Sequence, residues 1–420
     1  MDKFLIEGGA TLSGTVVVSG SKNASLPILA AALLTKERVV IRRVPDVSDT
    51  NYMLQILRAL GAHVERASGT VIVEAADIHP DAPYELVRKM RASICVMGPL
   101  VGRLGRASVS LPGGCVIGDR PVDLHLRGLA DIGANVNVKG GNIVIDAGAG
   151  LEGKEVELRG KHGPTVLGTD NLMMAAVLAK GTTVIEGAAA EPEVEDLANF
   201  LNAMGAKVTG GGTRRIVIEG VKELQGTDYT VIPDRIEAGT FLAAGALAGG
   251  KVTLVRAEPK HLGAVLETLK ECGHGIEVEG DRITVERGAN PRGCKLVTQP
   301  YPGFPTDMQA QMCALFATTP GISVVTETIF QQRFMHLAEM TRMGAQVQIE
   351  GATAVINGVE KLEAAPVMAS DLRASAALVL AALTAEGETE VNRVYHIDRG
   401  YEHIDDKLLA LGAKIRRVRE

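Results

Sequence analysis

One pattern of apolar and polar positions returns along the whole chain. A short apolar run such as Thr230-Val231-Ile232 predicts a strand, and the alanine-rich stretch from Ala238 to Ala244 that follows it predicts a helix. A second helical stretch then ends at a glycine and is followed by an alternating run such as Ala206-Lys207-Val208, which favours a strand. The pattern predicts strand, loop, alanine-rich helix, strand, loop, second helix and two further strands, and therefore an α/β fold.

The unit is repeated six times along the chain, and each copy has a glycine at the end of its second helix. The spacing of these glycines, 68 to 72 residues, is longer than the roughly 20 to 50 residues of solenoid repeats. We therefore expect the units to close into compact groups, and three units per domain is the simplest closure. The six glycines are Gly61, Gly133, Gly205, Gly273, Gly344 and Gly412.

Polar and charged residues return between the first strand and the alanine-rich helix of each unit. Free N–H groups at a helix start attract anions, so equivalent loops brought together would form an anion-binding cleft. Helix capping is the alternative, because Asp234, Asp307 and Asp371 are favoured N-cap residues. Capping does not explain positive charge, which is unfavourable at a helix start unless an anion offsets it. The positive residues at these starts are Lys22, Arg91 and Arg373.

Cys115 lies in a glycine-rich stretch, residues 111–121, five residues before Arg120. Glycines leave the backbone free to move, and a guanidinium nearby would hold an anion close to the sulfur. The stretch indicates a reactive thiol that serves as nucleophile, redox sensor or acid. Cys95 and Cys313 lie in apolar helical patterns and are interpreted as buried small hydrophobes. With five cysteines and no CxxC pair, we expect reduced thiols in the cytoplasm.

Composition narrows the possible partners. The 420 residues are 46% hydrophobic and only 3% aromatic, with no Trp, which gives material for large cores but argues against stacking platforms for single-stranded nucleic acid. A net charge of -6 argues against a generally basic binder of nucleic acid or membrane surfaces. No apolar run reaches the length of a membrane span, so we expect neither export nor insertion.

Five motifs of this chain are informative together. They are Lys22-Asn23, Leu111-Pro112-Gly113-Gly114-Cys115 with residues 118–126, residues 304–311, Glu327-Thr328-Ile329-Phe330 and residues 395–401. With these motifs the chain closely resembles the UDP-N-acetylglucosamine 1-carboxyvinyltransferase group of the enolpyruvyl transferase family. The resemblance implies a two-domain inside-out α/β barrel of six repeats of about 70 residues, three per domain. It implies an N-terminal domain of residues 21–229 that carries the Cys115 loop, and a C-terminal domain of residues 1–20 plus 230–420, with the active site in the interdomain cleft.

The resemblance also implies an activity. The enolpyruvyl group of phosphoenolpyruvate passes to the 3-hydroxyl of UDP-N-acetylglucosamine with release of phosphate, as the first committed step of peptidoglycan and cell wall synthesis, on which cell shape and division depend. No metal or organic cofactor is implied, and the partners are these two small molecules. We expect a monomer or weak homo-oligomer, and alkylation of Cys115 by epoxide antibiotics of the fosfomycin kind.

The matched motifs imply a role for each site residue. Cys115 matches the proton donor to the methylene carbon of phosphoenolpyruvate, and Asp307 matches the carboxylate that takes the proton from the sugar hydroxyl. The catalytic set is Cys115, Asp307, Lys22 and Arg399, and the phosphoenolpyruvate-binding set is Lys22, Asn23, Arg120 and Arg399. The set implied for UDP-N-acetylglucosamine is Arg91, Arg120, Pro121, Val122, Asp123, Leu124, Thr165, Val166, Asp307 and Ile329, and a domain-closure element is implied at Asp371, Leu372 and Arg373.

One loop departs from the family pattern. Where the family often carries Ser-Val-Gly-Ala-Thr, this chain has Gly163-Pro164-Thr165-Val166-Leu167-Gly168-Thr169. Thr165 and Val166 keep the character of the family element, but the glycine is shifted, and Lys161 and His162 are candidates to replace some of its contacts. His396 and His403 flank Arg399, but no third ligand stands at a recognisable spacing, so no metal site is predicted.

Three other functions compete with this interpretation. The shikimate-pathway enolpyruvyl transferase resembles the family in fold but lacks the loop of Cys115. A non-catalytic nucleotide-sugar sensor would not be expected to retain both Cys115 and Asp307. A thiol redox protein would use Cys115 with a resolving cysteine, and none lies nearby in the sequence.

Overall fold

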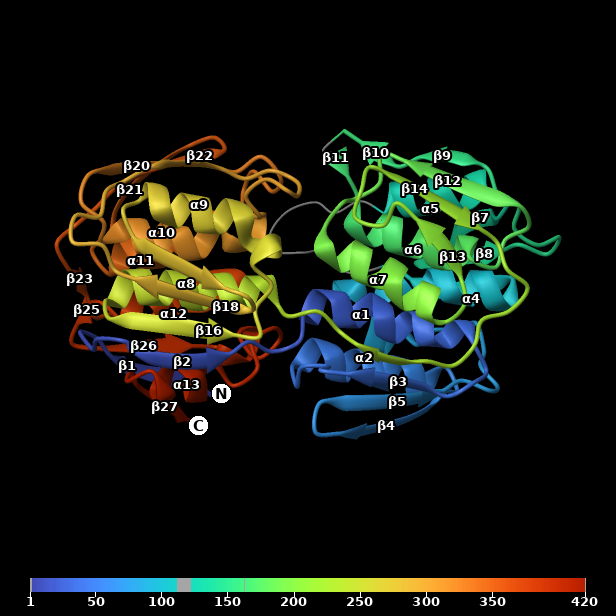
Figure 1. The fold of residues 1–420 in the computed structure, drawn as a ribbon, viewed down its shortest axis with the longest axis horizontal. Helices are drawn as coiled ribbons and strands as arrows, with labels where there is room; N and C mark the ends of the chain where they lie inside the picture. Colours follow the sequence, from blue (N-terminus) through green and yellow to red (C-terminus); the bar gives the residue numbers. More distant parts are fainter. Residues whose placement is uncertain (1, 112–121, 162, 420) are drawn as a thin grey trace. The chain divides into compact units, whose positions relative to one another are not determined.

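The computed structural model describes residues 2–111, 122–161 and 163–419, and its ribbon is drawn in Figure 1. The chain packs as two compact units. The C-terminal unit comprises residues 2–19 and 233–419, and the N-terminal unit comprises residues 20–111 and 122–232. The chain passes between units next to the boundaries expected after residues 20 and 229.

Three four-stranded sheets form the outside of the C-terminal unit (Figure 1). In each sheet the first two strands are parallel and the other neighbours antiparallel. The first is β2 (Gly14–Val17), β16 (Lys251–Val255), β18 (Arg282–Glu286) and β17 (Gly275–Glu279). The second is β19 (Lys295–Val297), β20 (Ile322–Thr326), β22 (Thr353–Asn357) and β21 (Gln346–Glu350). The third is β24 (Val367–Met368), β26 (Glu388–Asn392), β1 (Lys3–Glu7) and β27 (Lys414–Val418).

The N-terminal unit repeats this connectivity in two four-stranded sheets and has one sheet of three strands. The first four-stranded sheet is β15 (Asp228–Thr230), β3 (Val39–Arg42), β5 (Thr70–Glu74) and β4 (His63–Ala67). The second four-stranded sheet is β9 (Glu155–Glu157), β12 (Thr182–Glu186), β14 (Arg215–Glu219) and β13 (Lys207–Thr209). The third is β6 (Arg106–Ser110), β8 (Asn142–Asp146) and β7 (Asn135–Lys139). Two short pairs complete the strands: β10 (Arg159–Gly160) with β11 (Gly163–Pro164), and β23 (Leu362–Glu363) with β25 (Ala385–Glu386).

The alanine-rich helices lie inside the sheets in both units (Figure 1). In the C-terminal unit they are α8 (Arg235–Ala248), α10 (Gln309–Ala317) and α12 (Leu372–Ala382), and every residue of α10 and α12 is buried. In the N-terminal unit the equivalent helices are α1 (Lys22–Ala31), α4 (Met97–Leu104), which has two glycines and no alanine, and α6 (Val166–Ala176). Small residues let these helices approach closely, since a Cβ on Gly98 of α4 would lie 2.3 Å from the carbonyl oxygen of Asn171 in α6.

The second helix of each of the six repeats buries only one face. These helices are α2 (Ser48–Ala59), α5 (Asp123–Asp131), α7 (Pro192–Ala203), α9 (Gly263–Glu271), α11 (Met335–Arg342) and α13 (Ile404–Ala410). Shorter helical turns are α3 (Tyr84–Val87), η1 (Ala32–Leu34), η2 (Arg91–Val96), η3 (Pro259–Leu262), η4 (Thr306–Met308) and η5 (Val394–His396).

The predicted helix ends are confirmed by backbone geometry. The glycines that follow the second helices all have positive φ, from 88° at Gly344 to 105° at Gly133, a conformation that glycine adopts without strain. Alternating strands follow them, as expected, at β13 and β21. The α/β class predicted from the pattern is therefore correct.

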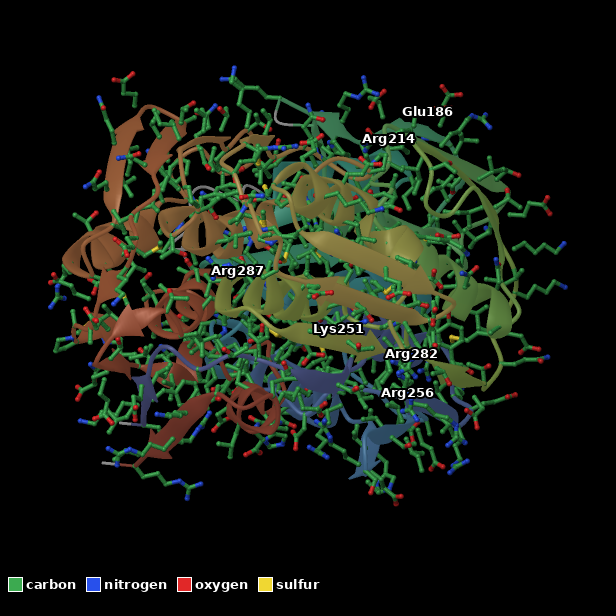
Figure 2. All side chains as sticks on the ribbon, turned by 60° about the vertical axis from the view of Figure 1, so that its left-hand side comes forward. Glu186, Arg214, Lys251, Arg256, Arg282 and Arg287 are labelled. Atoms are coloured by element: carbon green, nitrogen blue, oxygen red, sulfur yellow. The ribbon has the colours of Figure 1, made fainter. Side chains whose placement is uncertain are left out.

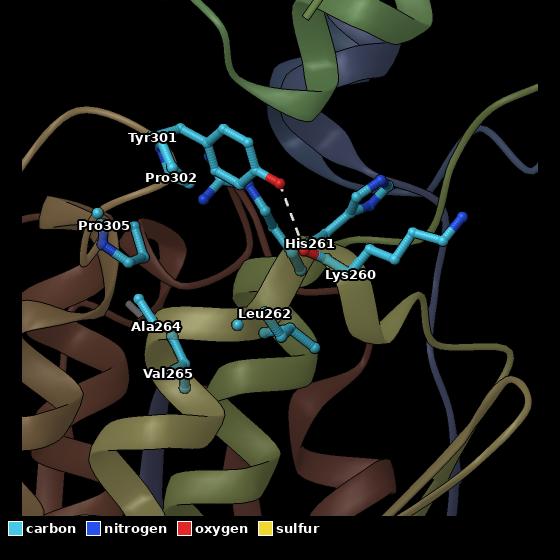
Figure 3. Close-up of a pocket in the computed structure, with 11 residues that line it drawn as sticks. Lys260, His261, Leu262, Ala264, Val265, Tyr301, Pro302 and Pro305 are labelled. Atoms are coloured by element: carbon cyan, nitrogen blue, oxygen red, sulfur yellow. Dashed lines mark hydrogen bonds between the residues drawn. The ribbon is translucent and has the colours of Figure 1, made fainter.

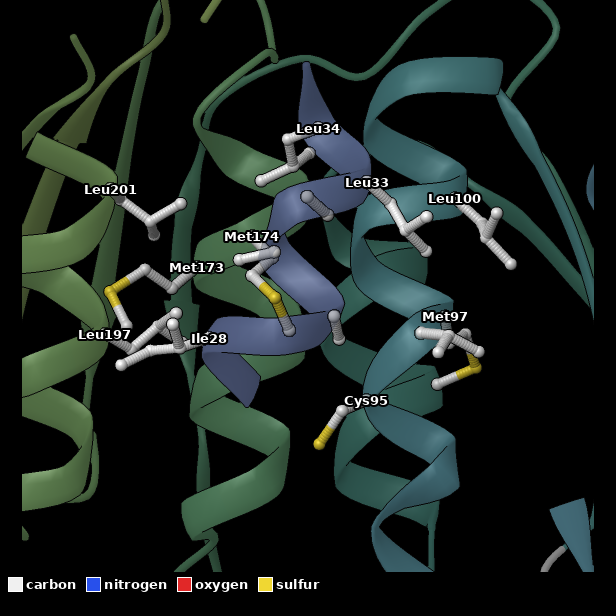
Figure 4. Packing of buried hydrophobic residues seen from close by; sticks show 14 of the residues in the cluster. Ile28, Leu33, Leu34, Cys95, Met97, Leu100, Met173, Met174, Leu197 and Leu201 are labelled. Atoms are coloured by element: carbon white, nitrogen blue, oxygen red, sulfur yellow. The ribbon is translucent and has the colours of Figure 1, made fainter. Parts of the chain in front are cut away.

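Each unit has its own apolar core. Figure 4 shows part of the N-terminal core, where Leu33, Met97 and Met173 come from neighbouring helical segments. Cys95 lies in this core and Cys313 in the other, both fully buried, which confirms their interpretation as small hydrophobes. None of the described helices is long and apolar enough to cross a membrane.

The outer face of the sheet β2-β16-β18-β17 carries charges of both signs. Lys251 of β16 and Arg282 of β18 are exposed on it, and Arg256 and Arg287 are exposed directly after these two strands (Figure 2). The Lys251 ammonium lies 3.8 Å from the carboxylate of Glu277. Buried Val252 and Leu254 alternate with the outward residues of β16, as a one-sided sheet requires.

The two segments that pass between the units are hydrogen-bonded to each other. The N–H of Ser21 donates to the carbonyl of Ile232 at 2.7 Å, and that of Asp234 donates to the carbonyl of Ser19 at 2.9 Å. Gly20 is required here, because a Cβ would lie 1.6 Å from the carbonyl oxygen of Arg43. Helices α1 and α8 begin directly after these segments, with Lys22 as the first residue of α1 and Asp234 as the N-cap of α8.

Candidate active site

Two of the three carboxylates at the helix starts of the C-terminal unit are caps, as the capping alternative predicted. The carboxylate of Asp234 accepts from the N–H groups of Ile236 and Glu237 at 2.8 and 2.9 Å. That of Asp371 accepts from the N–H of Arg373 at 2.8 Å at the start of α12. These bonds satisfy N–H groups that have no partner within their helices.

Asp307 does not cap a helix, so capping is wrong at this position. It lies inside η4, and Pro305 occupies the position before that turn. Its carboxylate instead accepts from the guanidinium of Arg333 at 2.9 Å and from Nε of Arg373 at 3.3 Å. Both arginine side chains are nearly inaccessible, at 5% and 3% exposure, while that of Asp307 remains 26% exposed. The arrangement leaves the carboxylate as the group that reaches solvent.

Arg373 corrects the expectation that a positive helix start must await an anionic ligand. Its charge is offset within the unit by Asp307, and its guanidinium also lies 5.1 Å from the centre of the Tyr401 ring. Burial by itself lowers the pKa of Arg373, but Tyr401, Asp307 and Asp234 outweigh it and raise that pKa. Its Nη1 is buried and has no hydrogen-bond partner within the described residues. One buried cationic donor therefore remains available to a ligand.

A buried glutamate supports the Asp307 turn. Glu327 is fully buried, and its Oε1 accepts from the hydroxyl of Thr298 at 2.7 Å, while its Oε2 accepts from the hydroxyl of Thr306 at 2.9 Å. The Arg333 guanidinium donates to Thr306 at 3.0 Å, which links the glutamate to Asp307. The N–H of Ile329 also donates to Glu327 at 2.8 Å, which fixes this sequence-predicted residue beside the turn.

Sequence reasoning missed Arg333 and the supporting role of Glu327. The signal for Glu327 was present in the motif Glu327-Thr328-Ile329-Phe330, but a glutamate after a strand has no pattern that distinguishes a buried support from a solvated charge. Arg333 lies 26 residues after Asp307, and only folding brings the two side chains together.

Arg399, another sequence-predicted residue, lies in the turn after η5. It is close enough to His396 to lower the pKa of that imidazole, although burial of His396 is the larger cause. Within the described residues, no group of three or more His, Cys, Asp or Glu is arranged to hold a metal ion.

The N-terminal unit places a second set of predicted residues at helix starts. Ser21 caps α1, so Lys22 and Asn23 are its first two residues, both half-buried. The Lys22 ammonium lies 2.9 Å from the carboxylate of Asp49, whose side chain is 1% exposed. Asp49 lies in the same unit as Lys22, and its carboxylate offsets the lysine charge, for which the sequence indicated no counterion.

Arg91 begins η2, which packs against α1 and α6. It contributes to lowering the pKa of His125 to about 4, although burial of the imidazole is the larger cause. The side chains of His125 and Asn171 are hydrogen-bonded at 3.0 Å. Arg91 thus lies near α5 and α6, which carry other residues of the N-terminal unit that are predicted for the nucleotide sugar.

Those residues lie at two helix starts. Val122 immediately precedes α5, and Asp123 and Leu124 are its first residues. The hydroxyl of Thr165 caps α6 by accepting from the N–H of Gly168 at 3.2 Å, and Val166 is the first residue of that helix. Cys115, Arg120, Pro121 and His162 lie outside the described residues.

A small cavity of about 40 Å³ lies beside the Asp307 turn and is lined by Arg235, Lys260, Tyr301 and Pro305, among others (Figure 3). The hydroxyl of Tyr301 donates to the carbonyl of Lys260 at 3.3 Å, which ties its two walls together. Pockets for drug-sized ligands occupy roughly 300 to 1,000 Å³. The cavity is too small for a nucleotide sugar.

Comparison with known proteins shows the family to which this fold belongs. The chain has the fold of the enolpyruvyl transferase NikO from Streptomyces tendae, at a TM-score of 0.89 and 26% identity over 99% of both chains. It also has the fold of an EPSP synthase from Acinetobacter baumannii, at a TM-score of 0.77 and 18% identity over 100% of both chains. A family model described as EPSP synthase (3-phosphoshikimate 1-carboxyvinyltransferase) matches residues 6–408. The chain belongs to this enolpyruvyl transferase family.

Within the family, the chain is similar to proteins named UDP-N-acetylglucosamine 1-carboxyvinyltransferase. The relative from Akkermansia muciniphila is 64% identical over 100% of this chain and 99% of its own length. The relative from Methylacidiphilum infernorum is 58% identical over 100% of this chain and 99% of its own length. These findings confirm the resemblance inferred from the motifs.

His336 of α11 makes the stability of the C-terminal unit sensitive to acid. Burial lowers its pKa to about 4, below the value near 6.5 of an unfolded histidine, so the unfolded chain binds more protons between these values. This contribution to stability is complete above about pH 6.5 and is lost as the pH falls towards 4. In urea unfolding at pH 7.5 and pH 5.0, we expect a smaller acid-induced fall of the midpoint in His336→Gln than in the wild type. Exposed His63→Gln is the control, and an unchanged fall in His336→Gln would contradict the assignment.

Proposed function

We propose that this chain transfers the enolpyruvyl group of phosphoenolpyruvate to the 3-hydroxyl of UDP-N-acetylglucosamine and releases phosphate, the first committed step of peptidoglycan synthesis. The observation that carries the proposal is the carboxylate of Asp307, which is turned away from capping and held by Arg333 and Arg373. The names of relatives 64% and 58% identical over the full chain support the choice of substrates. The shikimate-pathway reaction is the second candidate, because the matching family model carries that name.

The proposed architecture is an inside-out α/β barrel of six repeats, three in each unit. The recurrence of one sheet connectivity around buried alanine-rich helices supports it. The two units then correspond to the two enolpyruvyl-transferase domains, and the proposed reaction uses residues of both.

Asp307 is the proposed base. In the addition step the sugar hydroxyl attacks the substituted carbon of phosphoenolpyruvate, and its proton passes to the Asp307 carboxylate. Two guanidinium groups pair with that carboxylate and fix its orientation. In the elimination step phosphate leaves with the C–O bonding electrons, and a proton leaves the methyl carbon to restore the double bond.

Cys115 is the proposed acid that protonates the methylene carbon during addition, a role carried over from its motif. A thiol with a pKa near its reference value of about 8.5 is mostly protonated at neutral pH and can donate. Acid and base are then two different groups, as the addition step requires.

Lys22, Arg120 and Arg399 are the proposed partners of the phosphate and carboxylate of phosphoenolpyruvate, with Asn23 as a hydrogen-bond donor. The placement of Lys22 and Asn23 at a capped helix start supports this, since the N-terminal dipole adds attraction for an anion. The cations also stabilise the charge that develops as phosphate departs.

The proposed nucleotide-sugar contacts come from three helix starts and the Asp307 turn. The residues proposed for the diphosphate and the uracil are Arg91, Arg120, Pro121, Val122, Asp123 and Leu124. Thr165 and Val166 are proposed to contribute from α6. Asp307 and Ile329 contact the sugar. Asp371, Leu372 and Arg373 form the proposed closure element, because the start of α12 is joined to the catalytic carboxylate through Arg373.

We further propose that the protein acts in the cytoplasm as a monomer or weak homo-oligomer and without a cofactor. The free thiols Cys95 and Cys313 fit a reducing compartment. Addition and elimination need only proton transfer and anion binding.

Substrate pairing decides between the two candidate activities. We expect purified protein to release phosphate from phosphoenolpyruvate with UDP-N-acetylglucosamine and not with shikimate 3-phosphate, followed with a colorimetric phosphate assay. Release with shikimate 3-phosphate alone would support the second candidate. No release with either acceptor would favour a non-catalytic nucleotide-sugar sensor.

Asp307→Asn tests the proposed base. An amide of the same shape cannot take the hydroxyl proton, so we expect kcat to fall by about 10²- to 10⁴-fold. The unfolding temperature should fall as well, because Arg333 and Arg373 lose the negative charge that offsets theirs, so kcat is measured well below the unfolding transition. Exposed Asp281→Asn is the matched control and should keep wild-type kcat. A decrease below about 10-fold in Asp307→Asn would exclude this carboxylate as the general base.

Substitution of Cys115 tests the proposed acid. A carboxylic acid can also deliver a proton, whereas an alcohol is too weak an acid, so we expect turnover in Cys115→Asp and its near loss in Cys115→Ser. Fosfomycin should add mass to the Cys115 peptide of the wild type, and Cys115→Asp should resist the drug. Full activity of Cys115→Ser would refute the acid role.

A further inference from the structure

A second thiol site lies in the C-terminal unit, in a part of the chain for which neither sequence nor mechanism suggests a use. The sulfur atoms of Cys272 and Cys294 lie 3.1 Å apart, although the residues are 22 positions apart in the sequence. Cys272 follows the last turn of α9, and Cys294 directly precedes β19. The two other described cysteines, Cys95 and Cys313, lie singly in the apolar cores.

The backbone holds both cysteines in position. The N–H of Cys272 donates to the carbonyl of Thr268 at 2.9 Å, and its own carbonyl accepts from the N–H of Arg292 at 3.0 Å. The carbonyl of Cys294 accepts from the N–H of Val324 at 3.0 Å in the neighbouring strand. Because the S–S bond of a disulfide is about 2.05 Å long, the two sulfurs need to approach by only about 1 Å to bond covalently.

The two thiols differ in exposure. Cys272 is fully buried, whereas Cys294 is partly exposed. A hydrogen bond from the Cys272 thiol to the Cys294 sulfur lowers the pKa of Cys294 and raises that of Cys272. Reactivity follows thiolate character and access, so Cys294 has the features of an attacking thiol and Cys272 those of a resolving one.

We propose that Cys272 and Cys294 form a peroxide-sensitive dithiol that closes to an intrachain disulfide between α9 and β19. The Cys294 thiolate attacks one oxygen of hydrogen peroxide, the O–O bond breaks, and hydroxide leaves a sulfenic acid on Cys294. The sulfur of Cys272 then attacks that sulfenic sulfur, the S–O bond breaks, and a second hydroxide leaves. The Cys272 proton and the proton released when Cys294 ionises convert both hydroxides to water. Two electrons pass from the sulfurs to the peroxide, which is reduced to two waters.

The disulfide would fasten two segments that lead towards the Asp307 turn. Strand β19 is followed by Thr298, whose hydroxyl holds Glu327 and, through it, Thr306. The turn η3, which precedes α9, lines the small cavity beside Pro305. The cross-link therefore constrains the unit that carries Asp307, and the proposal does not depend on the proposed enzymatic function.

Peptide mapping of oxidised full-length protein tests the proposal without any substitution. Reduced protein is treated with hydrogen peroxide, free thiols are blocked with iodoacetamide, and the chain is cut with trypsin. We expect residues 271–282 joined to residues 293–295, at the summed peptide mass less two hydrogens, and separate alkylated peptides after dithiothreitol. Recovery of both peptides only in unlinked form, at peroxide doses that oxidise Cys294, would overturn the proposal.

Thermal unfolding gives a second measurement. Closing a loop of this length should raise the unfolding temperature of the C-terminal unit by about 8 °C, and dithiothreitol should reverse the rise. Cys294→Ser keeps every other cysteine and is the matched control, in which we expect neither the linked peptide nor the rise. An equal rise in Cys294→Ser would show that another thiol is responsible and would contradict the cross-link.

Discussion

The alanine-rich helices α8, α10 and α12 are buried on every side, and the rest of the C-terminal unit follows from that constraint. A helix that is apolar all round has to be covered all round, and three sheets provide the cover. Small side chains let the helices pack closely against one another, which brings their first turns into one region. Charged groups at those turns are then withdrawn from water together and have to be offset by one another or by a ligand.

The charges at these turns are offset in different ways. Asp234 and Asp371 satisfy backbone N–H groups, whereas Asp307 satisfies Arg333 and Arg373. The Glu327 carboxylate supports the Asp307 turn by accepting a hydrogen bond from the hydroxyl of Thr306. The charge of Arg373 is offset by Asp307, but one buried N–H donor of Arg373 has no hydrogen-bond partner among the described residues. An anionic substrate is the kind of partner that fits such a donor.

The two thiol sites of this chain require different surroundings. Cys115 belongs to a glycine-rich stretch beside an arginine, a pattern that is readable along the sequence. Cys272 and Cys294 have no such pattern, and their pairing exists only because α9 ends where β19 begins. The acid role proposed for Cys115 and the oxidant-sensitive pair proposed for Cys272 and Cys294 would place two kinds of thiol chemistry in one chain, because thiol reactivity depends on exposure and neighbouring charge.

The sequence by itself determined the repeated unit, the α/β class and the helix ends, because periodicity and glycine caps are local properties of the chain. Its long motifs also determined the family. The sequence did not reveal which charged residues at the helix starts are caps, which offset one another and which await a ligand. Only the tertiary structure decided that Asp307 contacts Arg333 and Arg373, that Lys22 contacts Asp49, and that Cys272 meets Cys294. Each of these pairs joins residues 22 to 66 positions apart, and their separation after folding depends on how buried helices and sheets pack rather than on any local pattern.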